Sequence, residues 1–291
     1  MSPGNPGLVE KAAEIAREAG ALVLSYFKRG VKTEYKGDTG VDLVTEADRS
    51  SEKLIVERLR AAFPNHDIVG EEGTRTSSGA GEYHWYVDPL DGTTNFAHGF
   101  PVFCVSLGLE RAPSGDEEQA QLVAGVIYDP TRDELFAVER GRGAKLNGAP
   151  IHVSRTRTLG ESLIATGFPS KKRHANPNIH FYQEITLHSH GVRRAGAAAL
   201  DLAYTACGRF DGYWEFNLNP WDVSAGILLV EEAGGKVTQF NGTPFELGTP
   251  REILASNGVI HRELIDRFAS IFAGGVDELP SLAEYVKQRY S

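Results

Sequence analysis

The chain has little cysteine, a single methionine and no redox motif. Its 291 residues contain two cysteines and one methionine. Cys104 and Cys207 each lie inside an apolar segment, and no Cys-x-x-Cys pair is present. Buried thiols in apolar surroundings act as small apolar side chains, so we expect reduced, inert cysteines and no redox chemistry.

The sequence also lacks the features that carry a chain into or across a membrane. The first seven residues contain no basic region followed by an apolar signal core, and no apolar run approaches the length that spans a bilayer. We therefore expect a cytoplasmic protein that has no membrane partner.

Basic residues are in deficit. Lys and Arg number 30 against 39 Asp and Glu, which gives a formal net charge of −9. Nonspecific nucleic-acid binding requires a basic face, so no nucleic-acid partner is expected. An acidic protein would also repel an anionic substrate unless metal ions reversed the local field. The apolar content of 41% and charged content of 24% are otherwise typical of a globular chain, long enough for one large domain or two lobes.

Periodicity predicts two lobes of different construction. In the first, two helices (8–27 and from Thr45 to Phe63) pack against an antiparallel sheet that includes strands 103–109, 122–128 and 134–138. In the second, strands alternate with helices. The predicted strands are 163–168, 191–196, 210–216 and 253–257, and the predicted helices are 177–189, 197–203, one from 221 onward, and 259–273. Polar residues 154–159 suggest a boundary, with lobes 1–155 and 156–291. Residues 35–40 and the basic stretch 169–174 are predicted loops, and a helical tail at 279–290 has no assigned role.

Residues 84–96 carry the strongest local pattern. An apolar run, 84–87, is followed by Asp88 and Asp91, and Pro89 should prevent simple continuation of the strand. Gly92 permits a sharp turn, and the Thr-Thr-Asn that follows is suited to starting a helix. The two carboxylates could then hold a hard cation beside N–H groups that hold an anion. The alternative is a pair of aspartates that only cap a turn.

Other acids follow predicted strands or begin predicted helices. Glu71 and Glu72 come directly after the short strand 67–70, where they are either solvated loop residues or, for Glu71 above all, ligands on the same rim. Asp48 lies three residues after Thr45 in a capping pattern, and Asp222 could be the N-cap of a helix that opens at Trp221. Residue types alone leave both readings open.

Two segments together resemble the signatures of the inositol monophosphatase family. Residues 88–96 (DPLDGTTNF) are similar to the first signature, and 221–226 (WDVSAG) with 231–235 (EEAGG) to the second. The segments lie about 130 residues apart in the family order, which is far more specific than either alone. The resemblance runs from the first helix to about residue 260. It implies an α+β, or α/β, fold of the inositol monophosphatase/fructose-1,6-bisphosphatase type, a layered αβαβα sandwich of two lobes, usually a homodimer.

The resemblance also implies a metal site. The first ion would take Glu71, Asp88 and the Leu90 carbonyl. The second would take Asp88, Asp91 and Asp222, and a third, weaker ion would bind at Glu71. An all-oxygen ligand set suits two or three Mg²⁺ ions, with Mn²⁺ as a substitute, and argues against zinc.

By the same resemblance, Thr93 paired with Asp48 would position the attacking water, and Glu71 would share in catalysis. The N–H groups of Gly92 and Thr93 would hold the phosphate. The substrate pocket would be formed by Asp91, Gly196, Ala198, Glu215 and Asp222, with Arg193 as a weaker candidate. Glu72 is a weaker candidate than Glu71 for the metal ligand. Glu215, at the family's spacing before Asp222, would bind a substrate hydroxyl.

The implied reaction is Mg²⁺-dependent hydrolysis of a phosphate monoester, inositol-1-phosphate to myo-inositol and phosphate, inhibited by lithium. The nucleophile would be a metal-activated water attacking in line, and the chain has no Cys-x₅-Arg motif to suggest a covalent intermediate. Related enzymes cleave fructose-1,6-bisphosphate, adenosine 3′,5′-bisphosphate or histidinol phosphate, so these remain alternatives. A regulatory binding protein that uses the same fold is a further alternative.

Overall fold

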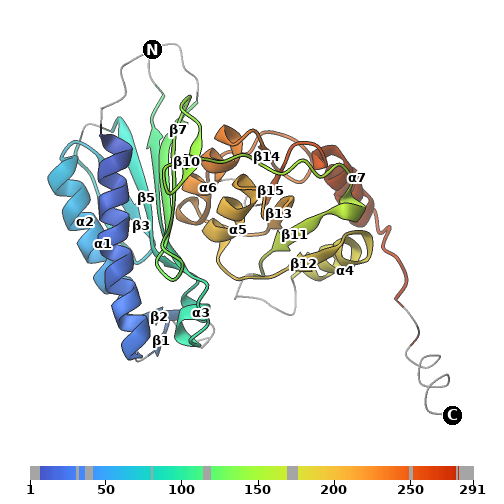
Figure 1. The fold of residues 1–291 in the computed structure, drawn as a ribbon, viewed down its shortest axis with the longest axis horizontal. Coiled ribbons are helices and arrows are strands. Elements are labelled where there is room, and N and C mark those ends of the chain that lie inside the picture. The colour runs from blue at the N-terminus through green and yellow to red at the C-terminus, as the bar shows by residue number, and fades with distance from the viewer. Residues whose placement is uncertain are drawn as a thin grey trace.

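The computed structural model describes residues 7–30, 33–36, 42–79, 81–113, 119–168, 176–248, 252–279 and 281, with only the backbone for 33–36 and 42–44. These residues form five layers that alternate helix and sheet (Figure 1). Two short elements complete the first half, a two-stranded sheet of β1 (Thr33–Lys36) and β2 (Asp42–Thr45), and α3 (Thr93–Ala97).

The first layer consists of α1 (Leu8–Arg29) and α2 (Glu46–Ala62). The buried face of α1 has the spacing expected from the sequence, with Ala12, Ile15, Ala19 and Val23 inside. Helix α2 begins at a complete capping box, in which the Thr45 side chain and the Asp48 carboxylate bond each other's backbone N–H groups. Both helices pack on one face of the larger sheet.

The second layer is an eight-stranded sheet in the order β10-β9-β8-β7-β6-β5-β3-β4. Its strands are β3 (Asp67–Gly70), β4 (Arg75–Thr76), β5 (Tyr83–Asp91), β6 (Cys104–Arg111), β7 (Gln121–Asp129), β8 (Glu134–Glu139), β9 (Ala144–Leu146) and β10 (Ala149–Pro150). The prediction of a purely antiparallel sheet is wrong at one place, because β3 and β5 run parallel. Strand β4 lies at the edge of the sheet, antiparallel to β3. The next strand, β5, lies on the opposite side of β3 and runs in the same direction as β3. The carboxyl ends of β3 and β5 therefore lie at one edge.

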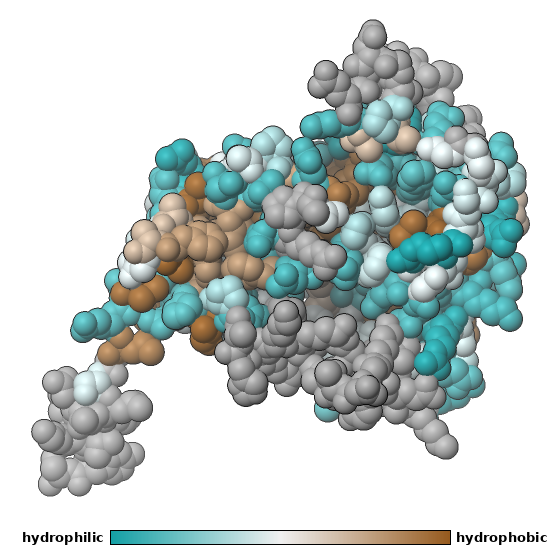
Figure 2. Space-filling view, turned by 180° about the vertical axis from the view of Figure 1, so that it is seen from behind, coloured by the Kyte–Doolittle hydropathy of each residue, from teal (hydrophilic) through white to brown (hydrophobic). Residues whose placement is uncertain are grey.

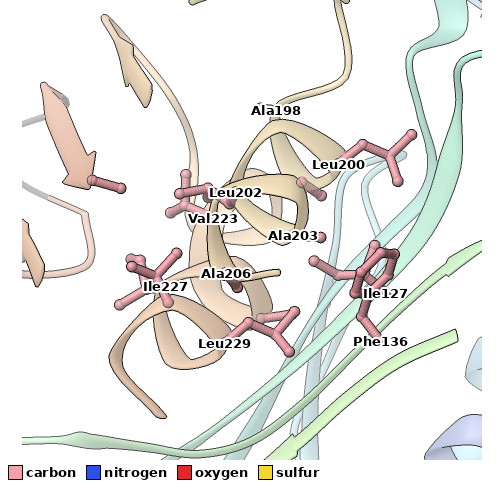
Figure 3. Packing of buried hydrophobic residues seen from close by; sticks show 14 of the residues in the cluster. Ile127, Phe136, Ala198, Leu200, Leu202, Ala203, Ala206, Val223, Ile227 and Leu229 are labelled. Carbon is pink, nitrogen blue, oxygen red and sulfur yellow. The ribbon is translucent and has the colours of Figure 1, made fainter. Parts of the chain in front are cut away.

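The third layer is the pair of helices α5 (Ala198–Ala206) and α6 (Pro220–Glu232), which lie between the two sheets (Figure 1). Nearly all of α5 is buried, and its many alanines let it fit in this narrow space. Figure 3 shows Ile127 and Phe136 of the larger sheet beside Ala203 and Leu229 of these helices, all in one apolar cluster.

The fourth layer is a five-stranded sheet in the order β12-β11-β13-β15-β14. Its strands are β11 (Leu163–Thr166), β12 (Gly191–Arg193), β13 (Gly212–Glu215), β14 (Lys236–Thr238) and β15 (Ile253–Ser256), preceded by a 3₁₀ turn at Leu159–Glu161. The outer helices α4 (Asn178–His188) and α7 (His261–Phe272) form the fifth layer. The layered αβαβα sandwich inferred from the sequence is thereby confirmed.

Several local predictions need correction. Tyr35 and Lys36, expected in a loop, lie in β1, and β14 was not predicted. The predicted strand 84–87 continues to Asp91. The basic stretch 169–174, and all but residues 279 and 281 of the predicted tail helix, lie outside the described residues.

The outer helices carry exposed apolar side chains, Ile179 and Leu187 on α4 and Phe272 at the end of α7. Figure 2 shows hydrophobic and hydrophilic residues mixed over one face of the molecule. Among the described residues, no helix is both long and apolar enough to cross a membrane.

Candidate active site

The parallel pairing of β3 and β5 brings Glu71 and the first acid of the first signature, Asp88, to one edge of the sheet. Gly70 is paired with Val87, so Glu71 and Asp88 are the next residues of neighbouring strands. The Glu71 N–H donates to the Val87 carbonyl at 3.1 Å, which extends the ladder to Glu71 itself. The sequence predicted that Glu71 could join the Asp88 rim, and the strand direction provides the physical reason.

Asp88 and Asp91 flank a bulge in β5. Asp88 pairs with Ser106 and Asp91 with Cys104, so two residues of β5 lie opposite one residue of β6. Pro89 lies in this bulge, where no ladder N–H is required, and the strand therefore continues past a proline that should have ended it. The Asp88 Oδ1 accepts the Leu90 N–H at 3.0 Å, which closes a tight local turn between the two acids.

Gly92 ends the strand with a left-handed backbone, φ +96°. A Cβ at this position would lie 2.8 Å from the Val102 carbonyl oxygen, so both conformation and space require glycine. Helix α3 begins at the next residue, as the Thr-Thr-Asn sequence predicted.

Asp222 reaches the site from α6, in the middle layer. The prediction that Asp222 could be the N-cap is wrong, because Asn219 occupies that position and Pro220 is the first helical residue. Asp222 is the third helical residue, and its Oδ2 accepts the Asn219 N–H at 2.7 Å in a capping box. This bond leaves the carboxylate further lone pairs for other contacts.

The four carboxylates share one electrostatic environment. Burial raises the pKa of Asp88 well above its usual value, and the neighbouring charges of Glu71, Asp91 and Asp222 raise it further. Burial also raises the pKa of Asp91 to about 7, although the Ala199 N–H at 2.7 Å from its Oδ2 acts in the opposite direction. Asp88 is buried and Glu71, Asp91 and Asp222 are half-buried. Carboxylate oxygens that repel one another are a donor set that hard divalent cations stabilise, so these residues fit the implied metal ions.

Thr93 and Asp48 are joined by a hydrogen bond. The Thr93 Oγ1 lies 3.0 Å from Asp48 Oδ1 and 3.1 Å from the Leu90 carbonyl oxygen. The other oxygen, Asp48 Oδ2, accepts from the Thr45 N–H at 2.8 Å and the Thr45 hydroxyl at 2.6 Å. Asp48 therefore serves as a helix cap and as the partner of Thr93, whereas residue types alone presented these as alternatives. Burial raises the pKa of Asp48, and the Thr45 and Thr93 hydrogen bonds oppose that shift.

Three predicted pocket residues approach from the second half of the chain. Glu215 ends β13, is buried, and accepts the Tyr213 hydroxyl at 2.6 Å. Burial raises the pKa of Glu215 to about 8, the Tyr213 hydrogen bond lowers it, and the charges of Asp222 and Asp91 raise it. Ala198 opens α5 beside Asp91, and Gly196 precedes it with φ +86°.

A known protein family and its solved members match this chain over most of its length. The profile described as the Inositol monophosphatase family matches residues 7–272. The chain belongs to this family. An inositol-1-monophosphatase of Synechocystis sp. is 44% identical over 265 residues, which cover 90% of this chain and 88% of that protein. A protein of Pseudomonas aeruginosa named Nus factor SuhB is 43% identical over 237 residues, covering 80% and 85% of the two chains.

A solved inositol monophosphatase from Anabaena (Nostoc) sp. has the same fold, with a TM-score of 0.78 and 42% identity over 95% of this chain and 97% of that one. Membership of this metal-dependent family, whose members act on small phosphorylated substrates, makes the chain a phosphatase. The resemblance stated from two signatures is confirmed, while the individual site roles remain predictions.

The two weaker candidates, Arg193 and Glu72, lie at or just after the ends of β12 and β3. Arg193 ends β12 with an exposed side chain, and its one described hydrogen bond goes to the Val192 carbonyl. Glu72 is half-buried in the turn after β3, and its backbone N–H donates to the Glu52 carboxylate. The roles of Arg193 and Glu72 stay predictions.

Asn95 is a site-building residue that sequence reasoning did not single out. Its Nδ2 donates to the carbonyls of Val102 and Ala195, both at 2.8 Å, and reaches the Gly196 carbonyl at 3.3 Å. Asn95 thereby ties α3 to the segment that precedes α5. Asn95 lies inside the first signature, and this position is the sequence feature that could have identified it.

A second group of ligand-type side chains lies in the fifth layer. Ligand atoms of Glu184, His188 and Asp277 all lie within 4.8 Å of one another. His188 Nε2 is 2.8 Å from Asp277 Oδ2, and Arg267 lies 3.6 Å from Glu184 Oε2. Because Arg267 already compensates the buried Glu184 charge, this group anchors the chain after α7 onto α4. It is separate from the carboxylates around Asp88.

Proposed function

We propose that this phosphatase hydrolyses phosphate monoesters in a Mg²⁺-dependent reaction, with inositol-1-phosphate as the preferred substrate. The observation that carries the proposal is the gathering of four carboxylates from three separate segments of the chain around the end of β5. The relatives named inositol-1-monophosphatase support the substrate.

The ions would be held by Glu71, Asp88, Asp91, Asp222 and the Leu90 carbonyl. When bound, Mg²⁺ supplies neutralisation of the phosphoryl oxygens and lowers the pKa of water. Mn²⁺ has similar ligand preferences and should substitute. The ligand types and their burial support this assignment, and the number of ions, two or three, remains a prediction.

Thr93 would orient the attacking water. When its hydroxyl proton points to Asp48 Oδ1, 3.0 Å away, the Oγ1 lone pairs can accept a hydrogen bond from that water. Asp48 is held by Thr45 and by its place in α2, so the acceptor direction is fixed before substrate binds. The N–H groups of Gly92 and Thr93 would donate to the phosphate.

Glu215 would select the alcohol half of the substrate. Its Oε2 is occupied by the Tyr213 hydroxyl, which fixes the orientation of the carboxylate. Oxygen Oε1 can then accept from a substrate hydroxyl, and a polyol such as inositol offers such donors. Gly196 and Ala198 would line this pocket with small side chains that leave room for a ring.

The test is phosphate release from inositol-1-phosphate, fructose-1,6-bisphosphate, adenosine 3′,5′-bisphosphate and histidinol phosphate, each with Mg²⁺, with chelator, and with Mg²⁺ plus lithium. We expect Mg²⁺-dependent turnover led by inositol-1-phosphate and reduced by lithium. Faster turnover of another substrate would overturn the role of Glu215 and keep the metal site. Absence of turnover on all four, from folded protein, would overturn the proposal.

A second function has one observation in its favour. A relative that is 43% identical carries the name Nus factor SuhB, so a regulatory binding role on the same fold is the alternative. Affinity capture with a catalytically inactive Asp91→Asn variant would separate this role from catalysis. Cytoplasmic location and a homodimer also remain predictions, the latter checked by light scattering of the purified protein.

A further inference from the structure

Glu52 is a buried acid of α2 that the proposed chemistry does not use. Its carboxylate accepts three hydrogen bonds, and all three donors belong to the turn that follows β3. Oε2 accepts the Glu72 N–H at 2.8 Å, and Oε1 accepts the Thr74 N–H at 3.1 Å and the Thr74 hydroxyl at 2.6 Å. Glu71, the proposed metal ligand, is the first residue of this turn.

The fit between Glu52 and the turn is close. A Cβ at Gly70 would lie 2.4 Å from Glu52 Oε2, so the carboxylate occupies the space that a side chain at residue 70 would need. Arg75, at the end of the turn, donates to the Gly70 carbonyl and lies over the ring of Trp221, 5.4 Å from its centroid. The turn is thus held from α2 on one side and contacts the start of α6 on the other.

Glu52 belongs to a row of buried polar residues on one face of α2. Ser51 and Glu52 lie three and four positions after Asp48, which places them on the same side of the helix as Asp48. Asp48 holds Thr93, and the Ser51 hydroxyl donates to the Pro89 carbonyl at 2.9 Å. The first turns of α2 therefore contact the turn that carries Glu71, the bulge between Asp88 and Asp91, and Thr93. These segments hold the proposed metal ligands of the first lobe and the residue proposed to orient the water.

We propose that Glu52 is a positioning residue that sets the affinity of the active site for divalent cations by fixing the backbone on both sides of Glu71. This inference rests on the proposed function. All three partners are donors, so an acceptor-only carboxylate is required. In Glu52→Gln one oxygen becomes an NH₂ group that faces either the Glu72 N–H or the Thr74 donors. The turn must then shift and carry the Glu71 carboxylate away from Asp88.

The experiment measures Mn²⁺ binding to the full chain by electron paramagnetic resonance, beside phosphate release as a function of Mg²⁺ concentration. For Glu52→Gln we expect about tenfold weaker Mn²⁺ binding, because charge-assisted buried hydrogen bonds are lost. The Mg²⁺ concentration for half-maximal rate should rise by a similar factor, while kcat at saturating Mg²⁺ changes less than about threefold. The matched control is Glu57→Gln, an exposed glutamate of the same helix, which should match the unsubstituted protein.

Thr74→Val is the second variant, since it removes one donor and keeps the helix intact. It should weaken Mn²⁺ binding in the same direction but less, and it serves if Glu52→Gln does not fold. Unchanged Mn²⁺ affinity in a folded Glu52→Gln protein would overturn the inference. If Glu52→Gln does not fold, unchanged affinity in Thr74→Val would overturn it instead. Either result leaves the proposed function standing. An unsubstituted protein that neither binds Mn²⁺ nor releases phosphate would overturn the proposed function, and this inference with it.

Discussion

At the scale of single residues, the site consists of carboxylates that lie close together, where burial and mutual repulsion disfavour their charged forms. Burial and the charges of Glu71, Asp91 and Asp222 act together to raise the pKa of Asp88. A protein without cations would gain nothing from this arrangement, since uncompensated buried charge destabilises the fold. We propose that bound cations compensate this cost.

Asp222→Asn should separate the ligand role from the structural role. The amide oxygen can still accept the Asn219 N–H, so the free energy of unfolding should change by less than about 1 kcal/mol. The loss of a charged ligand should lower kcat/KM for phosphate release about a hundredfold or more, since bound metal contributes several kcal/mol. Asp266→Asn, an exposed residue of α7, is the control. A variant with near-normal turnover would remove Asp222 from the ligand set.

Thr93→Val should separate water positioning from metal binding. Valine keeps the shape and removes the hydroxyl that lies 3.0 Å from Asp48 Oδ1. We expect kcat to fall about a hundredfold, since misplacement of a reacting group can cost that much, while Mn²⁺ affinity stays within about threefold. Thr93→Ser should recover much of the rate, and Thr94→Val, at the exposed neighbouring position, should retain it. A Thr93→Val enzyme with normal kcat would show that Thr93 does not orient the water.

At the scale of elements, the start of α7 contains a buried neutral histidine. His261 receives or donates hydrogen bonds at Thr238 Oγ1 and Ser256 Oγ, 2.9 and 2.8 Å away, and so joins β14, β15 and α7. Burial, with a contribution from the Lys236 charge, lowers the pKa of His261 from 6.5 to about 4. Protonation of His261 must therefore oppose folding.

This shift predicts a specific pH dependence of stability. Above about pH 6.5 the histidine is neutral in both states, and between about 6.5 and 4 only the unfolded chain gains the proton, so stability falls as pH falls. The loss should reach about 3 kcal/mol at pH 4. Urea unfolding at pH 7.5 and 5.0 should show a smaller decrease for His261→Gln than for the unsubstituted protein. The exposed His180→Gln variant should lose as much unfolding free energy between the two pH values as the unsubstituted protein does. An equal loss of unfolding free energy in all three proteins would contradict the prediction.

At the scale of the whole molecule, the middle helices α5 and α6 supply much of the apolar core, and α6 also supplies Asp222. Helix α6 packs against β6 and β7 of one sheet and presents Asp222 at its first turn. Close approach depends on glycines in those strands, because a Cβ at Gly125 would lie 2.9 Å from the Ala225 Cα. One apolar cluster contains residues from both predicted lobes, and the division at residue 155 stays a prediction.

Gly125→Ala should therefore destabilise the whole assembly. The added methyl group must push α6 away from the sheet, at a cost of about 1–3 kcal/mol in the free energy of unfolding. Because α6 also carries Asp222, the Mg²⁺ concentration for half-maximal rate should rise. Gly160→Ala is the matched control, since no atom lies within 4 Å of its added Cβ. Equal urea midpoints for the two variants would show that the helix layer tolerates displacement.

The sequence by itself determined the features that depend on neighbouring residues. The capping box at Thr45 and Asp48, the turn at Gly92 and the start of α3 follow from side chains within a few positions, and each was predicted. The two signatures also indicated the family and its five-layer fold, because a family pattern summarises tertiary packing that local propensity does not contain.

Only the tertiary structure decided the features that depend on pairing distant segments. The parallel direction of β3 beside β5 brings Glu71 to Asp88, and the bulge at Pro89 depends on the register of β6. Glu52 has a helical spacing from Asp48 that could have been noticed, but its three donors become neighbours only when the turn after β3 folds onto α2. Strand direction and register are set by the burial of whole faces, and no short stretch of sequence contains that information.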